Sequence, residues 1–183
     1  MSIFDSPNNQ GGSNGGRTVS VVFTGVPETI SAFTSLSQAV MQTPFDTVAL
    51  CVVALCVYPI NKDESIAMMN YLKGPAPLST YDISFIAERM VQNGKAPYLA
   101  LSYFNGATPQ NDYKPSSPYT VVVSENPYSY QEEGYANLFV SSGGADNPRP
   151  VKLRKAKDGK WYLWEFGGLL SDIRAPESSN PWA

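Results

Sequence analysis

Few residues of this chain can do acid/base or nucleophilic chemistry, because histidine is absent from all 183 positions. Its absence excludes Ser-His-Asp and Cys-His nucleophiles, histidine-ligated zinc and histidine acid/base catalysis. The carboxylates that could serve instead are Glu132, Glu133 and Asp146, and nothing in their spacing places two of them across a pocket. We therefore predict no catalytic residue, no metal site and no cofactor, and we favour a binding protein over an enzyme.

The two cysteines, Cys51 and Cys56, lie in an apolar run from residue 48 to residue 57. In a helix, a spacing of five residues turns the second side chain about 140° from the first, which is unsuitable for a disulfide. No charged residue within four positions lowers either thiol pKa. The run is also shorter than the roughly 20 residues of a membrane span, and no export signal is visible. These features predict buried, reduced cysteines and a cytoplasmic protein that does not enter a membrane.

Tyrosine is concentrated in one region, with seven of the eleven between residues 98 and 135. That region contains a long connection, residues 105–118, and connections of this length are often binding loops. Tyrosine offers a large contact area and a hydroxyl that orients a ligand. A peptide or sugar groove is one interpretation, and tyrosines that merely cover a sheet beside a proline-stiffened loop are the other. The candidate binding residues are Tyr103, Asn105, Asn111, Tyr113, Tyr128 and Tyr130.

Positive charge is concentrated near the C-terminus. From residue 147 onward the chain has seven basic and four acidic residues, whereas the preceding part has six and twelve. Alternation of Lys152 and Arg154 with Val151 and Leu153 is typical of a solvated sheet face, and a site for an anionic ligand is the alternative. The net charge of −3 and the lack of an RNA-binding signature argue against a nucleic-acid partner. The cluster comprises Arg149, Lys152, Arg154, Lys155, Lys157 and Lys160.

The elements that must position these residues follow from periodicity and from start and stop signals. Helices are predicted over residues 27–40, 44–58, 62–73 and 79–94, with caps at Thr43 and Ser79 and stops at Pro59 and Gly74. Strands are predicted over residues 18–24, 98–104, 119–124, 135–141, 151–155 and 160–166, with a hairpin turn at Asp158. The last strand is apolar on both faces, so we expect it to be central and covered by helices, unless one face meets a partner.

Helices that precede a run of strands predict an α+β fold, with N-terminal helices packed on one face of a mostly antiparallel sheet. Residues 1–17 are rich in Gly, Asn and Ser and are expected to form a flexible arm. Residues 18–176 are expected to form a single domain, followed by a flexible tail over residues 177–183.

Several short motifs resemble an uncharacterised bacterial family that is classed as a domain of unknown function. The resemblance covers residues 19–176 and implies no activity, substrate or catalytic residue. Residues 151–163 are also similar to the last hairpin of NTF2-like proteins, which place helices before a curved antiparallel sheet. The family motifs are Thr43-Pro44-Phe45, Ala54–Pro59, Tyr71–Pro75, Ser102–Pro109, Ser141–Asp146 and Trp161–Trp164.

Two functional hypotheses follow from the sequence. The first is a non-catalytic cytoplasmic module that binds a protein or another ligand through the Tyr-rich sheet and loop. The second is an NTF2-like small-molecule binder or enzyme whose cavity is lined by Tyr, Asp and Arg. A deep pocket with a buried carboxylate would favour the second, and a flat aromatic surface would favour the first. The ligand, the partner and the oligomeric state are left open.

Overall fold

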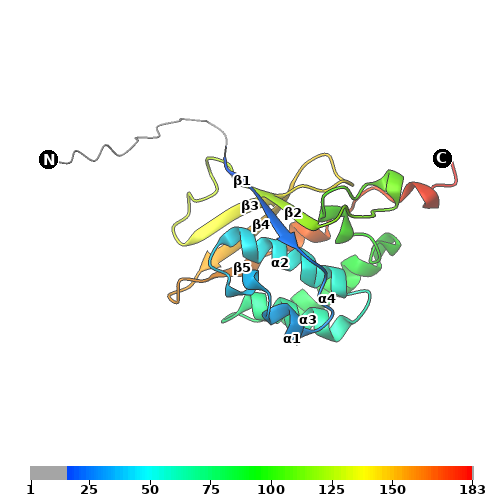
Figure 1. Ribbon diagram of the computed structural model, residues 1–183. Coiled ribbons are helices and arrows are strands. Elements are labelled where there is room, and N and C mark those ends of the chain that lie inside the picture. The colour runs from blue at the N-terminus through cyan, green and yellow to red at the C-terminus, as the bar shows by residue number, and fades with distance from the viewer. Residues whose placement is uncertain (1–15, 183) are drawn as a thin grey trace.

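The computed structural model describes residues 16–182, so the predicted arm lies almost wholly outside the described residues. Five strands form one antiparallel sheet in chain order, and the helices precede four of them, which confirms the α+β prediction (Figure 1). The strands are β1 Thr18–Phe23, β2 Tyr119–Ser124, β3 Tyr135–Val140, β4 Arg149–Lys155 and β5 Trp161–Glu165.

The three long helices begin where their local signals predict, and the first two also end there. The third was predicted to run to Gly94, but its α-helical part ends at Val91 and Gln92–Gly94 form a 3-10 turn. In α2, Pro44–Val57, the Thr43 side chain accepts a hydrogen bond from the Asp46 amide at 3.2 Å. Helix α3, Lys62–Lys73, ends at Gly74, and α4, Thr80–Val91, begins with a capping box between Ser79 and Asp82. Each cap satisfies amide groups that the first helical turn leaves without partners, which is why these boundaries can be predicted locally.

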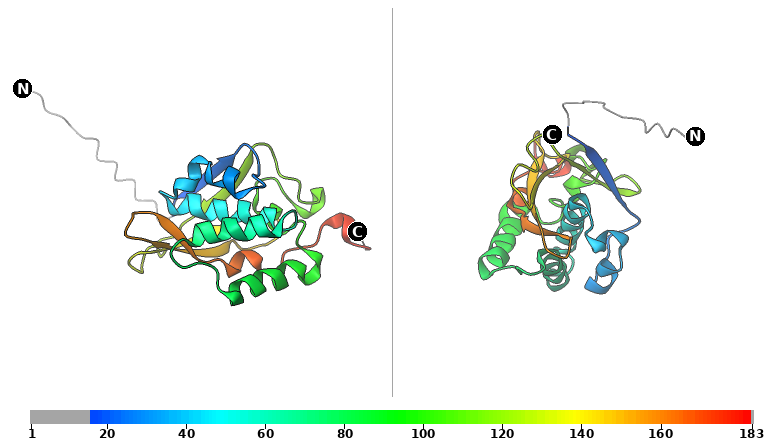
Figure 2. Two further views of the ribbon diagram at one scale, coloured as in Figure 1. Left: turned by 90° about the horizontal axis from the view of Figure 1, so that it is seen from below. Right: turned by 90° about the vertical axis from the view of Figure 1, so that its left-hand side faces the viewer.

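Helix α2 forms the centre of the core. It contacts all five strands, and every one of its residues except Asp46 is buried. A sheet that contacts one helix along all its strands must curl around that helix, and Figure 2 shows this curl in the end-on view. Helix α3 packs on α2, and α4 lies near the short turn Gly167–Leu170 that follows β5. Both cysteines of α2 are free and buried, as predicted.

The predicted strand over residues 98–104 is wrong. Residues Leu101–Tyr103 form a 3-10 turn, and only Phe104 makes an isolated bridge, to Val121 of β2. Leu99, Ala100, Ser102 and Phe104 are all buried, so this segment faces the core on more than one side. A short apolar run of this kind does not distinguish a strand from a helical turn.

The predicted helix over residues 27–40 is two short pieces, α1 Ile30–Thr34 and a 3-10 turn Ser37–Val40. The Thr34 and Ser35 hydroxyls both donate to the Ser31 carbonyl, at 3.2 and 2.9 Å. Such hydroxyl bonds compete with the helical pattern and bend or end a helix. Leu36 follows with ψ of 144°, which is extended backbone.

Strand β5 is not central, contrary to the prediction, because it forms one edge of the sheet and β1 forms the other. Its Leu163 is buried against the core, whereas Tyr162 and Trp164 are only partly buried. The outer edge of β5 is bonded to other elements instead of a sixth strand. The Trp161 amide donates to the Met41 carbonyl at 3.0 Å, and the Thr47 hydroxyl donates to the Trp161 carbonyl at 2.7 Å.

Candidate functional site

Two of the predicted binding tyrosines are buried. Tyr103 is 1% exposed and donates to the Leu169 carbonyl at 2.8 Å, and burial raises its pKa. Tyr113 is fully buried, stacks on Tyr98 with ring centroids 5.4 Å apart, and donates to the Arg174 carbonyl at 2.5 Å. Desolvation raises the pKa of Tyr113 to about 12. Both hydroxyls hold the C-terminal segment, and neither ring offers a surface to a ligand here.

The two predicted asparagines lie in the loop but differ in role. The Asn111 side chain braces the loop, because its oxygen accepts from the Thr108 and Lys114 amides while its nitrogen donates to the Gly106 and Lys114 carbonyls. Asn105 is exposed and lines a hollow of about 270 Å³ together with the 102–108 and 141–143 segments. The conformation of the long loop is therefore held by hydrogen bonds from one of its own side chains, that of Asn111.

The remaining two candidates, Tyr128 and Tyr130, lie in the connection between β2 and β3. Tyr128 is 65% exposed. Tyr130 donates to Glu125 at 2.8 Å and meets Trp161 edge-on, with ring centroids 6.4 Å apart. The structure thus does not bring all six candidates together on one surface, although Tyr103 and Asn105 both line the hollow of about 270 Å³.

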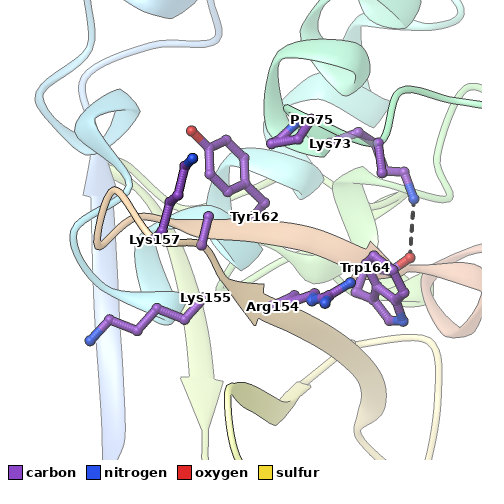
Figure 3. A pocket seen from close by; sticks show the side chains of 9 residues that line it. Lys73, Pro75, Arg154, Lys155, Lys157, Tyr162 and Trp164 are labelled. Carbon is purple, nitrogen blue, oxygen red and sulfur yellow. Dashed lines mark hydrogen bonds between the residues drawn. The ribbon is translucent and has the colours of Figure 1, made fainter.

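A different group of residues surrounds a hollow of about 400 Å³ between the C-terminal end of α3 and the β4–β5 hairpin (Figure 3). We call it the cationic pocket. Four of its wall residues carry positive charge, the other five are apolar or aromatic, and none is acidic. The wall comprises Lys73, Pro75, Ala76, Arg154, Lys155, Ala156, Lys157, Tyr162 and Trp164.

The Tyr162 ring is held in place from two sides. A Cβ added to Gly74 would lie 2.2 Å from two of the ring carbons, so the backbone there packs directly on the ring. The Tyr162 hydroxyl donates to Asp158 at 2.7 Å, a bond that raises the pKa of Tyr162 to about 12 and lowers that of Asp158. Asp158 belongs to the hairpin turn, where Gly159 has φ of 83° as the turn requires. Tyr162 therefore presents a fixed ring to the pocket.

Lys73 is the unusual member of the wall, because it is only 9% exposed and carries a charge. Its ammonium donates to the Trp164 carbonyl at 3.2 Å and lies 5.8 Å from the Trp164 ring centre. Within residues 16–182 it forms no ion pair. The end of α3 supplies only about half a negative charge, and burying an ammonium without a full counter-charge is costly.

Arg154 is oriented by aromatic rings. Its guanidinium carbon lies 4.8 Å from the Trp164 ring centre and 5.4 Å from that of Tyr135. Lys157 extends beside Tyr162 in Figure 3, whereas Lys155 points away and lies over Trp161, 5.7 Å from its ring centre. Three cations, from Lys73, Arg154 and Lys157, therefore remain beside the Tyr162 and Trp164 rings.

The cationic pocket has side chains that can bind an anion, but few that could transfer a proton. No carboxylate lines the pocket. Among residues 16–182, no cluster of three or more Cys, Asp or Glu side chains is arranged to hold a metal ion. A larger hollow of about 500 Å³ lies at the C-terminal end of α2, and its wall is mostly apolar, with Glu28 as its charged residue and no cation to orient an anionic ligand.

The sequence did not indicate Lys73, Tyr162 or Trp164 as site residues. For the basic cluster that contains Arg154 and Lys157 it favoured a solvated face, with a site for an anionic ligand as the alternative. One local signal was available, namely the aromatic residues at alternate positions on the outward face of β5 beside a basic strand. Lys73 gives no such signal, because it comes from a helix 91 positions earlier than Trp164.

Comparison with known proteins gives one match. No curated protein and no solved structure matches the chain. None of the helices in the described part of the chain is both long and apolar enough to cross a bilayer. One family model matches residues 25–177, which include all three long helices, β2 to β5 and every wall residue of the cationic pocket. The chain therefore belongs to the family described as a domain of unknown function, DUF6935.

Proposed function

We propose that this domain is a non-catalytic cytoplasmic binding module whose ligand is a small molecule carrying negative charge, held in the cationic pocket. The observation that carries the proposal is Lys73, a nearly buried residue of the pocket wall whose ammonium reaches the Trp164 carbonyl and has no acidic partner among the described residues. A bound anion would supply the missing counter-charge.

The surroundings of Lys73 support a ligand over a structural ion pair. Arg154 is exposed, yet stacking on Trp164 limits its freedom, so less conformational entropy is lost when it binds. A volume of about 400 Å³ lies within the range of small-molecule sites. The absence of histidine and of a carboxylate in the wall supports binding without catalysis.

The hypothesis of a Tyr-rich binding surface has weaker support, because Tyr103 and Tyr113 are buried. The enclosed Tyr/Asp/Arg cavity of the second hypothesis also has weaker support, because α2 fills the inner face of the sheet. The resemblance to NTF2-like proteins stays a prediction. Two free, buried cysteines are compatible with the proposed cytoplasmic location.

Calorimetric titration with pyrophosphate at low ionic strength tests the proposal. We expect Arg154→Gln and Lys157→Gln to weaken binding at least about tenfold each, because a charge-assisted contact contributes about 1.5–3 kcal/mol. Lys62→Gln and Lys114→Gln remove the same charge from exposed positions outside the pocket and serve as matched controls. If all four variants lose affinity equally, the anion responds to overall charge and the pocket is not the site.

A further inference from the structure

The wall of the cationic pocket has a second property that an inorganic anion would not use. Between Lys157 at one end and Lys73 with Arg154 at the other, the wall consists of the Tyr162 ring, Pro75 and small apolar groups (Figure 3). A phosphate group alone would occupy a small part of the pocket volume of about 400 Å³ and would leave this apolar wall exposed to water. The shape and the chemistry of the wall therefore call for a ligand with a flat apolar part.

From this we infer that the ligand is a phosphorylated compound with a planar ring, which is the chemistry of a nucleotide; this inference rests on the proposed function. The ring stacks against Tyr162, and the phosphate groups reach Lys73 and Arg154. Nucleotides in other proteins are held by the same two contacts, aromatic stacking of the base and charge-assisted hydrogen bonds to phosphate oxygens.

The charge of the wall selects the number of phosphates. Lys73, Arg154 and Lys157 line the pocket with no acidic residue in the wall, and the end of α3 offsets only about half a charge. A singly charged ligand would leave most of this charge uncompensated. A diphosphate, with two to three negative charges near neutral pH, matches it. The planar guanidinium of Arg154, held on Trp164, also suits two parallel bonds to phosphate oxygens.

The Tyr162 ring is suited to stacking because it is already fixed. Gly74 packs against one part of the ring, and the hydroxyl is bonded to Asp158 at the hairpin turn. A ring held in this way loses little conformational freedom when a base stacks on it, so more of the stacking energy is available for binding. Asp158 is not part of the pocket wall, so its charge is not placed against the phosphates.

The experiment compares three probes by calorimetry, namely ADP, pyrophosphate and adenosine, without added metal. We expect ADP to bind at least about tenfold more tightly than pyrophosphate, in line with the effect of stacking one base, and adenosine to bind much more weakly than either. Tyr162→Leu should abolish the advantage of ADP, which is measured as the ratio of the ADP and pyrophosphate affinities within the same variant. Tyr162→Phe keeps the ring and should keep the advantage, which separates stacking from the hydroxyl bond.

The outcomes distinguish the two levels of the proposal. Equal affinity for ADP and pyrophosphate, with both weakened by Arg154→Gln, would overturn the nucleotide inference and leave an anion-binding pocket. Binding of neither probe would overturn the proposed function as well. Circular dichroism tests whether the Tyr162→Leu variant is folded. If it is not, the comparison rests on Tyr162→Phe together with Arg154→Gln, where loss of the ADP advantage in the Phe variant counts against stacking.

Discussion

The contact between Gly74 and Tyr162 gives a quantitative test of how the pocket is built. Gly74 ends α3 with φ of 58° and ψ of −119°, a region that residues with a Cβ rarely enter. Holding alanine in such a conformation costs about 1–3 kcal/mol. The added Cβ would also lie 2.2 Å from the ring carbons Cδ1 and Cε1 of Tyr162, where ordinary carbon contacts are about 3.5–4.0 Å.

The ring must therefore move by more than about 1 Å in Gly74→Ala, and overpacking of this kind costs about 1–3 kcal/mol. The two effects together predict a loss of about 2–6 kcal/mol in the free energy of unfolding. Urea denaturation, monitored by circular dichroism, measures this loss as a lower midpoint concentration of urea. The dependence of the unfolding free energy on urea concentration stays unchanged if the transition remains two-state. The same displacement of Tyr162 should weaken ligand binding in the pocket.

Gly94→Ala is the matched control, because Gly94 also follows a long helix and has φ of 62°, but its Cβ would meet nothing within 4 Å. Only the backbone cost of about 1–2 kcal/mol is expected there. A double-mutant cycle isolates the contact, since Gly74→Ala should cost about 1–3 kcal/mol less in a Tyr162→Ala background. Equal costs in the two backgrounds, within about 0.5 kcal/mol, would refute the steric part of this reasoning.

Three further predictions concern the rest of the domain. The hydrogen bond from Lys95 lowers the pKa of Asp172, so this ion pair stabilises the fold above the unfolded carboxyl pKa of about 3.9 and its contribution is lost as the pH falls through the folded pKa. Asp172→Asn should therefore be less stable than wild type at pH 7 in urea denaturation and equal to it once the pH is below the lowered pKa of Asp172, and a difference that persists in acid would contradict this. Tyr103→Phe leaves a buried backbone carbonyl without a partner and should lower the unfolding free energy by about 1–3 kcal/mol, whereas an unchanged midpoint would show that the bond is not important. Burial raises the pKa of both Cys51 and Cys56, so a thiol reagent should label neither in the native protein at pH 8 and both in denaturant, and rapid native labelling would contradict their placement in the core.

Much of the fold follows from signals that lie within a few residues of each other. The caps at Thr43 and Ser79 predict where α2 and α4 begin, because each bonds an amide three positions ahead. The hairpin turn before β5 is equally local. The errors occur where no such signal exists, in the apolar segment 98–104 and in the hydroxyl-rich segment 30–40, whose backbone conformation depends on what packs against it.

The candidate site depended far more on tertiary structure. Tyrosine composition pointed to Tyr103 and Tyr113, but composition does not show whether a side chain faces the core or the solvent. Both are buried because the C-terminal segment folds over them and accepts their hydroxyl bonds. The alternation of basic and apolar residues in β4 was visible in the sequence. The residues that lie beside these basic side chains in space, such as Lys73 and Trp164, were not.

The sequence by itself thus determined the fold class, the buried free cysteines of α2, the starts of the long helices and the absence of histidine chemistry. Only the tertiary structure decided that β5 is an edge strand and that Lys73 lies against Trp164. The physical reason is the distance along the chain over which each interaction acts. Caps, turns and periodicity act over three to five residues, whereas the pocket joins the end of α3 to a hairpin 91 positions later in the chain. The packing of α2 and α3 against the curled sheet brings these two segments together.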